Sequence, residues 1–186
     1  MKRLFDIVVA IILFCLFFIP MVIIALMIKA TSRGPVLFWS DRVGKDNDIF
    51  RMPKFRTMRT DTPDVATHLL KDADAYLIPV GSFLRKYSLD ELPQIWCVLT
   101  GDMSMVGPRP ALYNQDDLIE LRTKKGIHML TPGITGWAQV NGRDILTIPI
   151  KVNYDEHYMA NRSFLFDLKI LWITFRKVVR SEGVKH

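Results

Sequence analysis

The chain opens with a long apolar run and then changes to mixed apolar and polar positions. Between Ile7 and Ile28 no charged or polar residue occurs. At about 1.5 Å per residue, a helix of this length just crosses a hydrocarbon core of about 30 Å. The run is too long for a secretory signal peptide, and no small-residue cleavage site follows it. The pattern predicts a membrane helix with its flanks over residues 1–33 and a second unit over 34–186.

The residues alone leave the topology of this helix open. Lys2 and Arg3 precede the run, and Lys29 and Arg33 follow it, so the positive-inside rule gives no orientation. Pro20 lies inside the run, where it removes a helical hydrogen bond and favours a kink. A helix that spans the bilayer and a helix that re-enters the same face both fit this pattern.

The rest of the chain predicts a mostly helical α+β domain. The expected elements are strands at 36–39 and 49–52 joined by a turn at 44–48, helices at 83–99, 113–125 and 164–179, and turn-rich segments at 131–137 and 140–143. The two strands form a β-hairpin in this interpretation. The last helix has a broad apolar face that either packs on the core or lies along a membrane interface.

Composition narrows the choice of partners. The 186 residues include 25 Lys and Arg against 19 Asp and Glu, a formal net charge of +6. A basic chain with a membrane anchor is more typical of anionic lipids or phosphorylated substrates than of nucleic acid. Cys15 and Cys97 lie far apart, so we expect no disulfide framework, which suits a reducing cytoplasmic face. The sequence contains no zinc-ligand spacing and no Walker or Rossmann glycine loop.

Two adjacent carboxylates, Asp90 and Glu91, stand at the predicted N-terminus of a helix. The structural interpretation is a capping box in which Ser88 caps the helix and Glu91 bonds back. Pro93 instead favours a helix that starts near Asp90, where its missing N–H costs nothing. Either register places Asp90 where the helix dipole lowers a carboxyl pKa and attracts phosphate.

The two acids can also take separate chemical roles. Consecutive helical residues point about 100° apart, so Asp90 and Glu91 cannot form one two-oxygen clamp. One carboxylate can attack phosphorus while the other holds Mg²⁺, a metal that prefers hard oxygen ligands.

Basic residues supply the complementary charge. Arg109 stands between Pro108 and Pro110, which fix the backbone and pre-organise its guanidinium for a bidentate phosphate contact. A rigid surface turn is the structural alternative. Further candidates, each of which also reads as a solvated charge when taken alone, are Lys54, Arg56, Arg85 and Arg143.

Six motifs follow one another along the chain. They are KFRTM at 54–58, SLDELPQ at 88–94, GDMS at 101–104, GPRP at 107–110, PGITG at 132–136 and QVNGR at 139–143. Together they closely resemble the bacterial sugar transferases, in particular the monotopic, PglC-like polyprenyl-phosphate phosphoglycosyl transferases. The resemblance covers nearly the whole chain, which is similar to the minimal catalytic form of that family.

The resemblance implies an activity and a set of roles. A UDP-sugar would give its phosphosugar to undecaprenyl phosphate, releasing UMP, as the first membrane step of bacterial glycoconjugate assembly. Asp90 would be the nucleophile that forms a covalent phosphosugar intermediate, and Glu91 would bind the Mg²⁺ cofactor. The implied phosphate-binding residues are Lys54, Arg85, Arg109 and Gln139, with Arg143 as a further candidate for the nucleotide-sugar. A one-step metal-dependent transfer without a covalent intermediate is the alternative.

The resemblance also implies a location. It predicts a re-entrant N-terminal helix broken at Pro20, with amphipathic interfacial helices around a compact catalytic domain on the cytoplasmic face of the bacterial inner membrane. Family members often carry serine before this proline, whereas this chain has Ile19. Expected partners are the UDP-sugar, undecaprenyl phosphate and the phospholipid membrane, with downstream glycosyltransferases as further candidates and no nucleic acid. A membrane-tethered basic module without catalytic activity is the non-enzymatic alternative, and no motif identifies the sugar.

Overall fold

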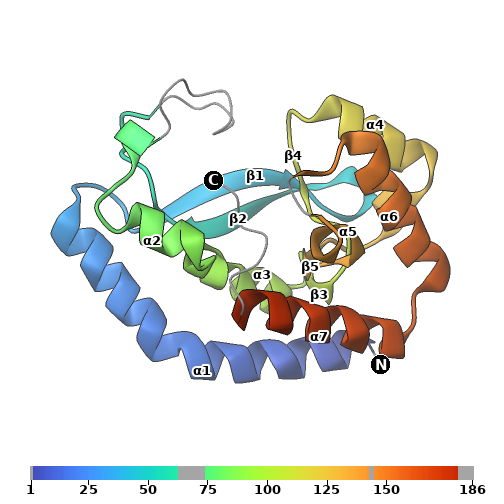
Figure 1. Ribbon diagram of the computed structural model, residues 1–186, viewed down its shortest axis with the longest axis horizontal. Helices are drawn as coiled ribbons and strands as arrows, with labels where there is room; N and C mark the ends of the chain where they lie inside the picture. Colours follow the sequence, from blue (N-terminus) through green and yellow to red (C-terminus); the bar gives the residue numbers. More distant parts are fainter. Residues whose placement is uncertain (1, 63–73, 143–144, 180–186) are drawn as a thin grey trace.

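A computed structural model describes residues 2–62, 74–142 and 145–179, and it shows a long helix beneath a small sheet and several shorter helices (Figure 1). The helices are α1 (Lys2–Thr31), α2 (Gly81–Lys86), α3 (Ile95–Thr100), α4 (Asp116–Lys124), α5 (Trp137–Val140), α6 (Ile148–Asn161) and α7 (Phe164–Val179). The strands are β1 (Leu37–Val43), β2 (Ile49–Phe55), β3 (Ser104–Val106), β4 (Ala111–Leu112) and β5 (Gly133–Thr135). Short 3₁₀ helices are η1 (Lys45–Asn47), η3 (Asp74–Tyr76), η4 (Leu89–Gln94) and η5 (Ile127–Met129). The predicted mostly helical α+β class is confirmed.

The predicted β-hairpin is present, and its strands are longer than expected. β1 pairs antiparallel with β2 from Leu37↔Phe55 to Val43↔Ile49. β4 joins the other edge of β1, so the strand order is β2-β1-β4. β3 and β5 form a separate parallel pair. The hairpin therefore carries the KFRTM motif into the centre of the domain.

α1 follows the underside of the domain along its whole length. It is one helix with Pro20 inside it, and Figure 1 shows that it bends partway along. Its buried residues fall in both halves, with Asp6 and Ala10 near one end and Ile24 and Ile28 near the other. The second pair belongs to a small core shared with β2 and α2. By length and composition, α1 is long and apolar enough to cross a membrane.

Charged residues in the first turns of α1 attach it to the domain. Lys2 Nζ donates to Asp167 Oδ2 of α7 at 2.6 Å. Asp6 accepts hydrogen bonds from Ser104 Oγ at 2.8 Å and from the Met105 N–H at 3.2 Å. A buried carboxylate needs such partners, because burying it without them would be costly. The N-terminal end of α1 is therefore fixed to β3 and α7.

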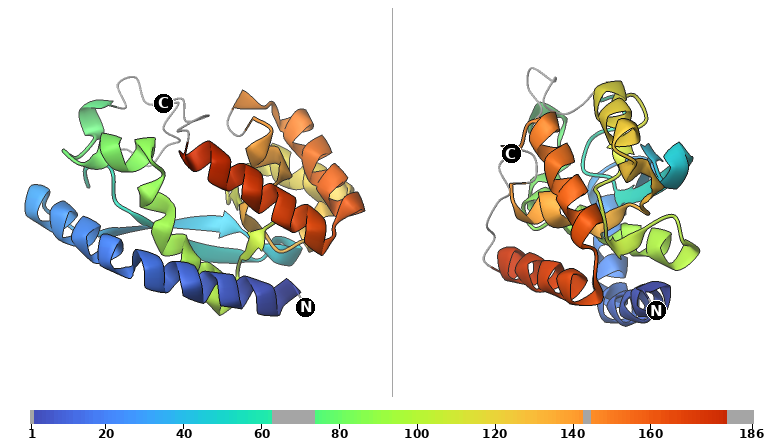
Figure 2. Two further views of the ribbon diagram at one scale, coloured as in Figure 1. Left: turned by 60° about the horizontal axis from the view of Figure 1, so that its bottom comes forward. Right: turned by 90° about the vertical axis from the view of Figure 1, so that its right-hand side faces the viewer.

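α7 spans 164–179 as predicted, and part of its apolar face packs on the core, while its position at a membrane interface stays a prediction. Asp167 and Ile170 are buried against the domain. Its large exposed apolar side chains are Phe164, Leu165, Leu168, Trp172, Phe175 and Val178. Figure 2 shows α7 and α1 side by side on one side of the molecule. Much of the exposed apolar surface therefore lies on two neighbouring helices.

The segment predicted as one helix over 83–99 is divided into α2, η4 and α3. Ser88 adopts a left-handed conformation with φ of 53°, which ends α2 and turns the chain into η4. Ser88 makes no side-chain capping bond, so the predicted capping box is wrong. Pro93 lies inside η4, where a short 3₁₀ helix tolerates it. The break sends Asp90 and Glu91 toward β2.

Other boundaries were predicted less completely. The helix expected over 113–125 begins three residues later, and Gly126 follows it in the left-handed region, at φ of 72°. β5 and α5 lie where irregular structure was expected. α6 was missed because its buried face, Val152, Asp155 and Tyr158, mixes apolar and charged residues. Cys15 and Cys97 are free, in agreement with the sequence.

Two backbone segments cross at three glycines. A Cβ added to Gly133 would collide with the backbone nitrogen of Gly107, and one added to Gly136 would collide with the Gly107 carbonyl oxygen. A Cβ on Gly107 would in turn collide with the carbonyl oxygen of Thr131. The GPRP and PGITG motifs therefore lie directly against each other, because only glycine permits this approach.

Candidate active site

A single carboxylate oxygen joins three segments of the chain. Glu91 Oε1 accepts a hydrogen bond from Lys54 Nζ of β2 at 3.1 Å and from Arg109 Nη2 at 2.6 Å. The exposed fractions of these side chains are only 14% for Glu91, 17% for Lys54 and 28% for Arg109. Three of the predicted site residues therefore meet in one half-buried cluster, beside Asp90.

The electrostatics of Asp90 differ from the sequence prediction. Burial raises the pKa of Asp90, and the neighbouring Glu91 carboxylate raises it further, while Lys54 and Arg85 act in the opposite direction. The predicted lowering of this pKa by a helix N-terminus is wrong. η4 is a six-residue 3₁₀ helix, and burial outweighs any effect of its end.

Burial and the neighbouring charges also shift the pKa of Lys54. Burial is the main cause that lowers the pKa of Lys54, Arg109 lowers it as well, and Glu91 and Asp90 counteract both. A cation that is kept in a half-buried place by two carboxylates can exchange part of that interaction for an incoming phosphate. The site thus suits charge exchange with an anionic ligand.

A second buried ion pair fixes the backbone of Arg109. Arg122 Nη1 donates to the Arg109 carbonyl oxygen at 2.8 Å. Asp155 Oδ2 accepts from Arg122 Nε at 3.0 Å and from Nη2 at 2.6 Å. Both partners are buried, so α4 and α6 together support the loop that carries Arg109. Sequence reasoning missed this support, because neither residue belongs to one of the six motifs.

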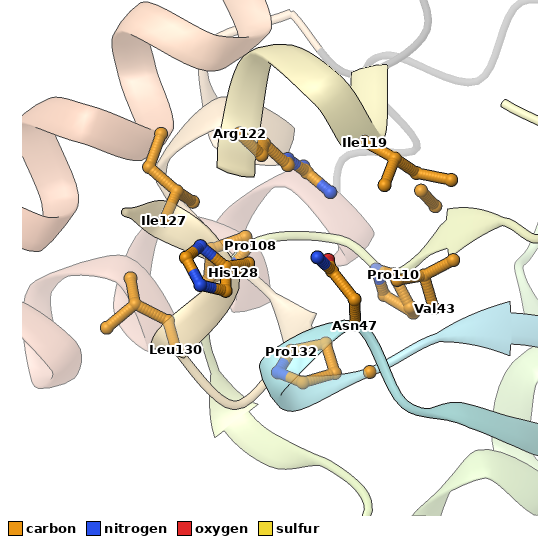
Figure 3. A pocket seen from close by; sticks show the side chains of 12 residues that line it. Val43, Asn47, Pro108, Pro110, Ile119, Arg122, Ile127, His128, Leu130 and Pro132 are labelled. Carbon is orange, nitrogen blue, oxygen red and sulfur yellow. The ribbon is translucent and has the colours of Figure 1, made fainter. Parts of the chain in front are cut away.

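A small cavity lies beside this loop. Figure 3 shows Pro108, Pro110, Arg122 and His128 among the side chains that line it. Its volume is about 30 Å³, enough for a water molecule and far too small for a nucleotide sugar. Neither Asp90 nor Glu91 lines it. The nucleotide sugar therefore does not bind in this cavity.

Arg85 and Arg56 have different roles. Arg85 Nε donates to Thr57 Oγ1 at 3.0 Å, and the Arg85 charge acts on Asp90. Arg56 is buried and donates to the Pro35 carbonyl oxygen at 2.6 Å and to Ser32 Oγ at 2.7 Å. Arg56 therefore links the end of α1 to the hairpin, whereas Arg85 belongs to the site.

Gln139 lies next to the glycine crossing. Both polar atoms of its amide are buried and have no hydrogen-bond partner among the residues that the structure describes. A Cβ on Gly136 would come within 2.6 Å of Gln139 Oε1, so the amide lies close to the GPRP loop. A buried amide without partners requires an explanation, and a ligand supplies one. Arg143, the remaining candidate, lies outside the described residues.

Arg42 is a basic residue near the cluster that sequence reasoning missed. It lies in β1, three residues beyond the predicted end of the strand, and it shares a strand face with Phe38, the partner of Lys54. Burial and the Arg109 charge lower the pKa of Arg42 to about 10, while Glu91 raises it. If the predicted strand had been extended to residue 42, the alternation of side chains would have placed Arg42 on the same face as Phe38, the partner of Lys54.

The Glu91 carboxylate fits a magnesium ion that binds together with a phosphorylated substrate. Within residues 2–62, 74–142 and 145–179 no group of three His, Cys, Asp or Glu side chains is arranged to hold a metal. Mg²⁺ commonly takes one or two carboxylates, with phosphate oxygens and water as its other ligands. Glu91 supplies one such carboxylate, and its role as a ligand stays a prediction.

Comparison with known proteins gives one consistent result. Residues 1–181 match the family described as bacterial sugar transferase. The chain is 43% identical over 187 residues to an uncharacterized sugar transferase, EpsL, of Bacillus subtilis, covering 100% of this chain and 90% of the relative.

Two further relatives have names that state an activity. One is a UDP-N-acetylgalactosamine-undecaprenyl-phosphate N-acetylgalactosaminephosphotransferase of Aeromonas hydrophila, 38% identical over 99% of this chain and 45% of its own length. The other is a UDP-glucose:undecaprenyl-phosphate glucose-1-phosphate transferase of Escherichia coli, 40% identical over 95% of this chain and 40% of its own length. The chain thus spans less than half of each of these two proteins.

The support of Arg109 by α6 leads to a test of stability. Replacing Asp155 with Asn leaves the Arg122 charge buried without its partner, which typically costs about 3–5 kcal/mol. For a chain of this size we expect a thermal unfolding midpoint about 6–20 °C lower, measured in detergent. Glu120→Gln, which removes one partner of the exposed pair with Lys124, is the matched control and should change the midpoint little. Equal midpoints for the two variants would show that the buried pair does not support the fold.

Proposed function

The chain belongs to the bacterial sugar transferase family, and on this basis we propose that it transfers a phosphosugar from a UDP-sugar to undecaprenyl phosphate, releasing UMP. The names of the Aeromonas and Escherichia relatives support both substrate classes. The observation that carries the proposal is the cluster of Asp90, Glu91, Lys54 and Arg109, in which cations surround two acids. Such a cluster suits a diphosphate substrate.

In the first step, a carboxylate oxygen of Asp90 attacks the phosphorus that bears the sugar. A bond forms between this oxygen and phosphorus, and the bond from phosphorus to the bridging oxygen breaks. The electron pair of that bond leaves with UMP. The raised pKa of Asp90 makes its carboxylate more basic than that of an ordinary aspartate, which favours bonding to phosphorus.

In the second step, a phosphate oxygen of undecaprenyl phosphate attacks the same phosphorus. The bond between phosphorus and the Asp90 oxygen breaks, and the electron pair returns to the carboxylate. The product is undecaprenyl-diphospho-sugar, and Asp90 is restored without net proton transfer. Two separate displacements allow a soluble donor and a lipid acceptor to use one site in turn.

The surrounding side chains bind and orient the substrates. Lys54 and Arg109 offer donors to phosphate oxygens from two sides of Glu91, and Arg85 adds positive charge beside Asp90. Gln139 supplies an amide that a ligand can satisfy. A magnesium ion held by Glu91 would neutralise charge on the diphosphate when it is bound. Pre-organised donors of this kind stabilise charge that develops in the transition state.

The packing of α1 supports a membrane location on one face. Both halves of α1 contact the same domain, through Asp6 and Ala10 at one end and Ile24 and Ile28 at the other. A helix whose two ends are held by one domain returns to the face from which it enters. We therefore propose a re-entrant helix, with the domain on the cytoplasmic face of the inner membrane, where UDP-sugars are present. The exposed apolar side chains of α7 would lie at the membrane interface.

Release of UMP tests the function and its mechanism. Purified protein in detergent is mixed with a panel of UDP-sugars and Mg²⁺, with and without undecaprenyl phosphate. We expect a burst of up to one UMP per active site without the lipid, and turnover only with it. Release of UMP that strictly requires the lipid phosphate would instead support the one-step alternative. Absence of UMP with every sugar would contradict the proposed function.

The raised pKa of Asp90 predicts a pH dependence of the burst. The carboxylate must be ionised to attack, so the rate is full above this pKa and falls as the pH decreases through it. We expect the decrease at a higher pH than for an ordinary aspartate, whose pKa is about 3.9. Arg85→Met should move the decrease to still higher pH, because Arg85 lowers the pKa of Asp90. An unchanged profile in this variant would show that Asp90 does not limit the rate.

Pro20→Leu tests the topology. Leucine restores the missing helical hydrogen bond, so we expect α1 to straighten toward a spanning helix. A cysteine in a short extension before Lys2, with Cys15 and Cys97 replaced by serine, would then lose its cytoplasmic labelling. Ile19→Leu, a neighbouring change that keeps the proline, is the control and should label like the parent protein. Full cytoplasmic labelling of the Pro20→Leu variant would contradict a role of the proline in re-entrance.

A further inference from the structure

Gln94 is buried at the end of η4 with an unused hydrogen-bond donor. Only 1% of its surface is exposed, and its Nε2 has no hydrogen-bond partner in the part of the chain that the structure describes. An amide N–H that leaves water without finding an acceptor destabilises the protein, so buried amides are normally bonded. Gln94 ends the SLDELPQ motif, three residues after Glu91. A buried, unused donor at this position requires an explanation.

The geometry of η4 places Gln94 on the same side as Glu91. In a 3₁₀ helix the side chains at i and i+3 are eclipsed, and η4 is such a helix as far as Gln94. Glu91 accepts from Lys54 Nζ of β2 at 3.1 Å. One turn after Gln94, Cys97 Sγ of α3 lies 3.9 Å from the Arg51 carbonyl oxygen of the same strand. Gln94 therefore lies between these two contacts, on the side of η4 that packs against β2.

Binding of a diphosphate changes the contacts of Glu91. Its Oε1 accepts from both Lys54 and Arg109, and these are the cations to which the proposed function assigns the phosphate oxygens. Each cation that turns toward phosphate gives up part of its bond to the carboxylate. A metal-binding carboxylate needs hydrogen bonds from further side chains that fix its orientation. The unused donor of Gln94 lies one 3₁₀ turn away from this carboxylate.

We propose that Gln94 is a positioning residue for Glu91. When Lys54 and Arg109 bind phosphate, the Gln94 amide donates to the Glu91 carboxylate and keeps it oriented toward the magnesium ion. The inference rests on the proposed function and adds to it a residue to which that proposal gives no role. The donor is idle in the free protein because the two cations already occupy Glu91 Oε1.

Two variants separate this role from packing. Gln94→Met keeps the length of the side chain and removes the amide. Because the amide N–H is buried without an acceptor in the free protein, its removal should leave the thermal unfolding midpoint unchanged or raise it. Cys97→Ala is the matched control, because Cys97 is buried one turn further along the same side and packs against the same strand. It should lower the midpoint, since it leaves a small cavity.

Metal binding is measured without turnover on the full-length protein in detergent. Electron paramagnetic resonance follows free Mn²⁺, which prefers the same oxygen ligands as Mg²⁺, during titration in saturating UDP. UDP supplies the diphosphate for Lys54 and Arg109. We expect Gln94→Met to weaken Mn²⁺ binding about tenfold or more and Cys97→Ala to leave it unchanged. Calorimetry without metal should give the same UDP affinity for both variants and the wild type, because Gln94 acts through Glu91.

The outcomes separate this inference from the proposed function. Gln94→Met protein that binds Mn²⁺ as tightly as the wild type would overturn the positioning role alone. So would an equal loss of metal-free UDP binding, which would make Gln94 a contact of the nucleotide, or a midpoint several degrees below the wild type, which would make it a support of the fold. Wild-type protein that binds Mn²⁺ with the expected dependence on Gln94 but releases no UMP would support the positioning role and contradict the proposed function.

Discussion

The candidate active site depends on one carboxylate oxygen that accepts hydrogen bonds from two cations. Glu91 Oε1 holds Lys54 and Arg109, which come from segments 37 residues before it and 18 residues after it. Without this carboxylate the two cations would repel each other, and the hairpin, η4 and the GPRP loop would lose their common contact. The rest of the fold positions the three segments that carry these side chains. The hairpin delivers Lys54, the turn at Ser88 directs η4, and the glycine crossing together with the pair of α4 and α6 fixes the loop of Arg109.

The same arrangement connects the proposed membrane anchor to the chemistry. α1 is attached through Asp6 to β3, which leads directly into the GPRP loop, and its second half shares a core with β2 and α2. The apolar helix is therefore a supporting layer of the domain, in addition to its proposed role as an anchor. The helix is bent and is held to the domain at both ends. This arrangement suits the proposed transfer to a lipid phosphate.

Much of the fold could be predicted where local patterns decide the structure. The apolar run at 7–28 and the amphipathic run at 164–179 indicated their helices, and alternation indicated the hairpin. The prediction failed where tertiary contacts determine the structure or the electrostatics. α6 carries a buried charge whose partner lies on another helix, so its period is obscured. The pKa of Asp90 follows from burial, which a sequence does not show. Arg42 comes close to the site through its contacts with β4 and the Pro110 carbonyl oxygen, and the sequence does not show these contacts. The pair Asp90 and Glu91, in contrast, was visible as a motif.

The proposed role of Asp90 as nucleophile is tested most directly by mass spectrometry of the intact protein. The reaction is quenched shortly after mixing with a UDP-sugar and Mg²⁺ without lipid. The predicted result is a mass increase equal to one phosphosugar, located on the peptide that contains Asp90, absent in Asp90→Asn and lost when undecaprenyl phosphate is added. Formation of UMP in the wild type with no adduct, or an adduct of equal yield in Asp90→Asn, would contradict it.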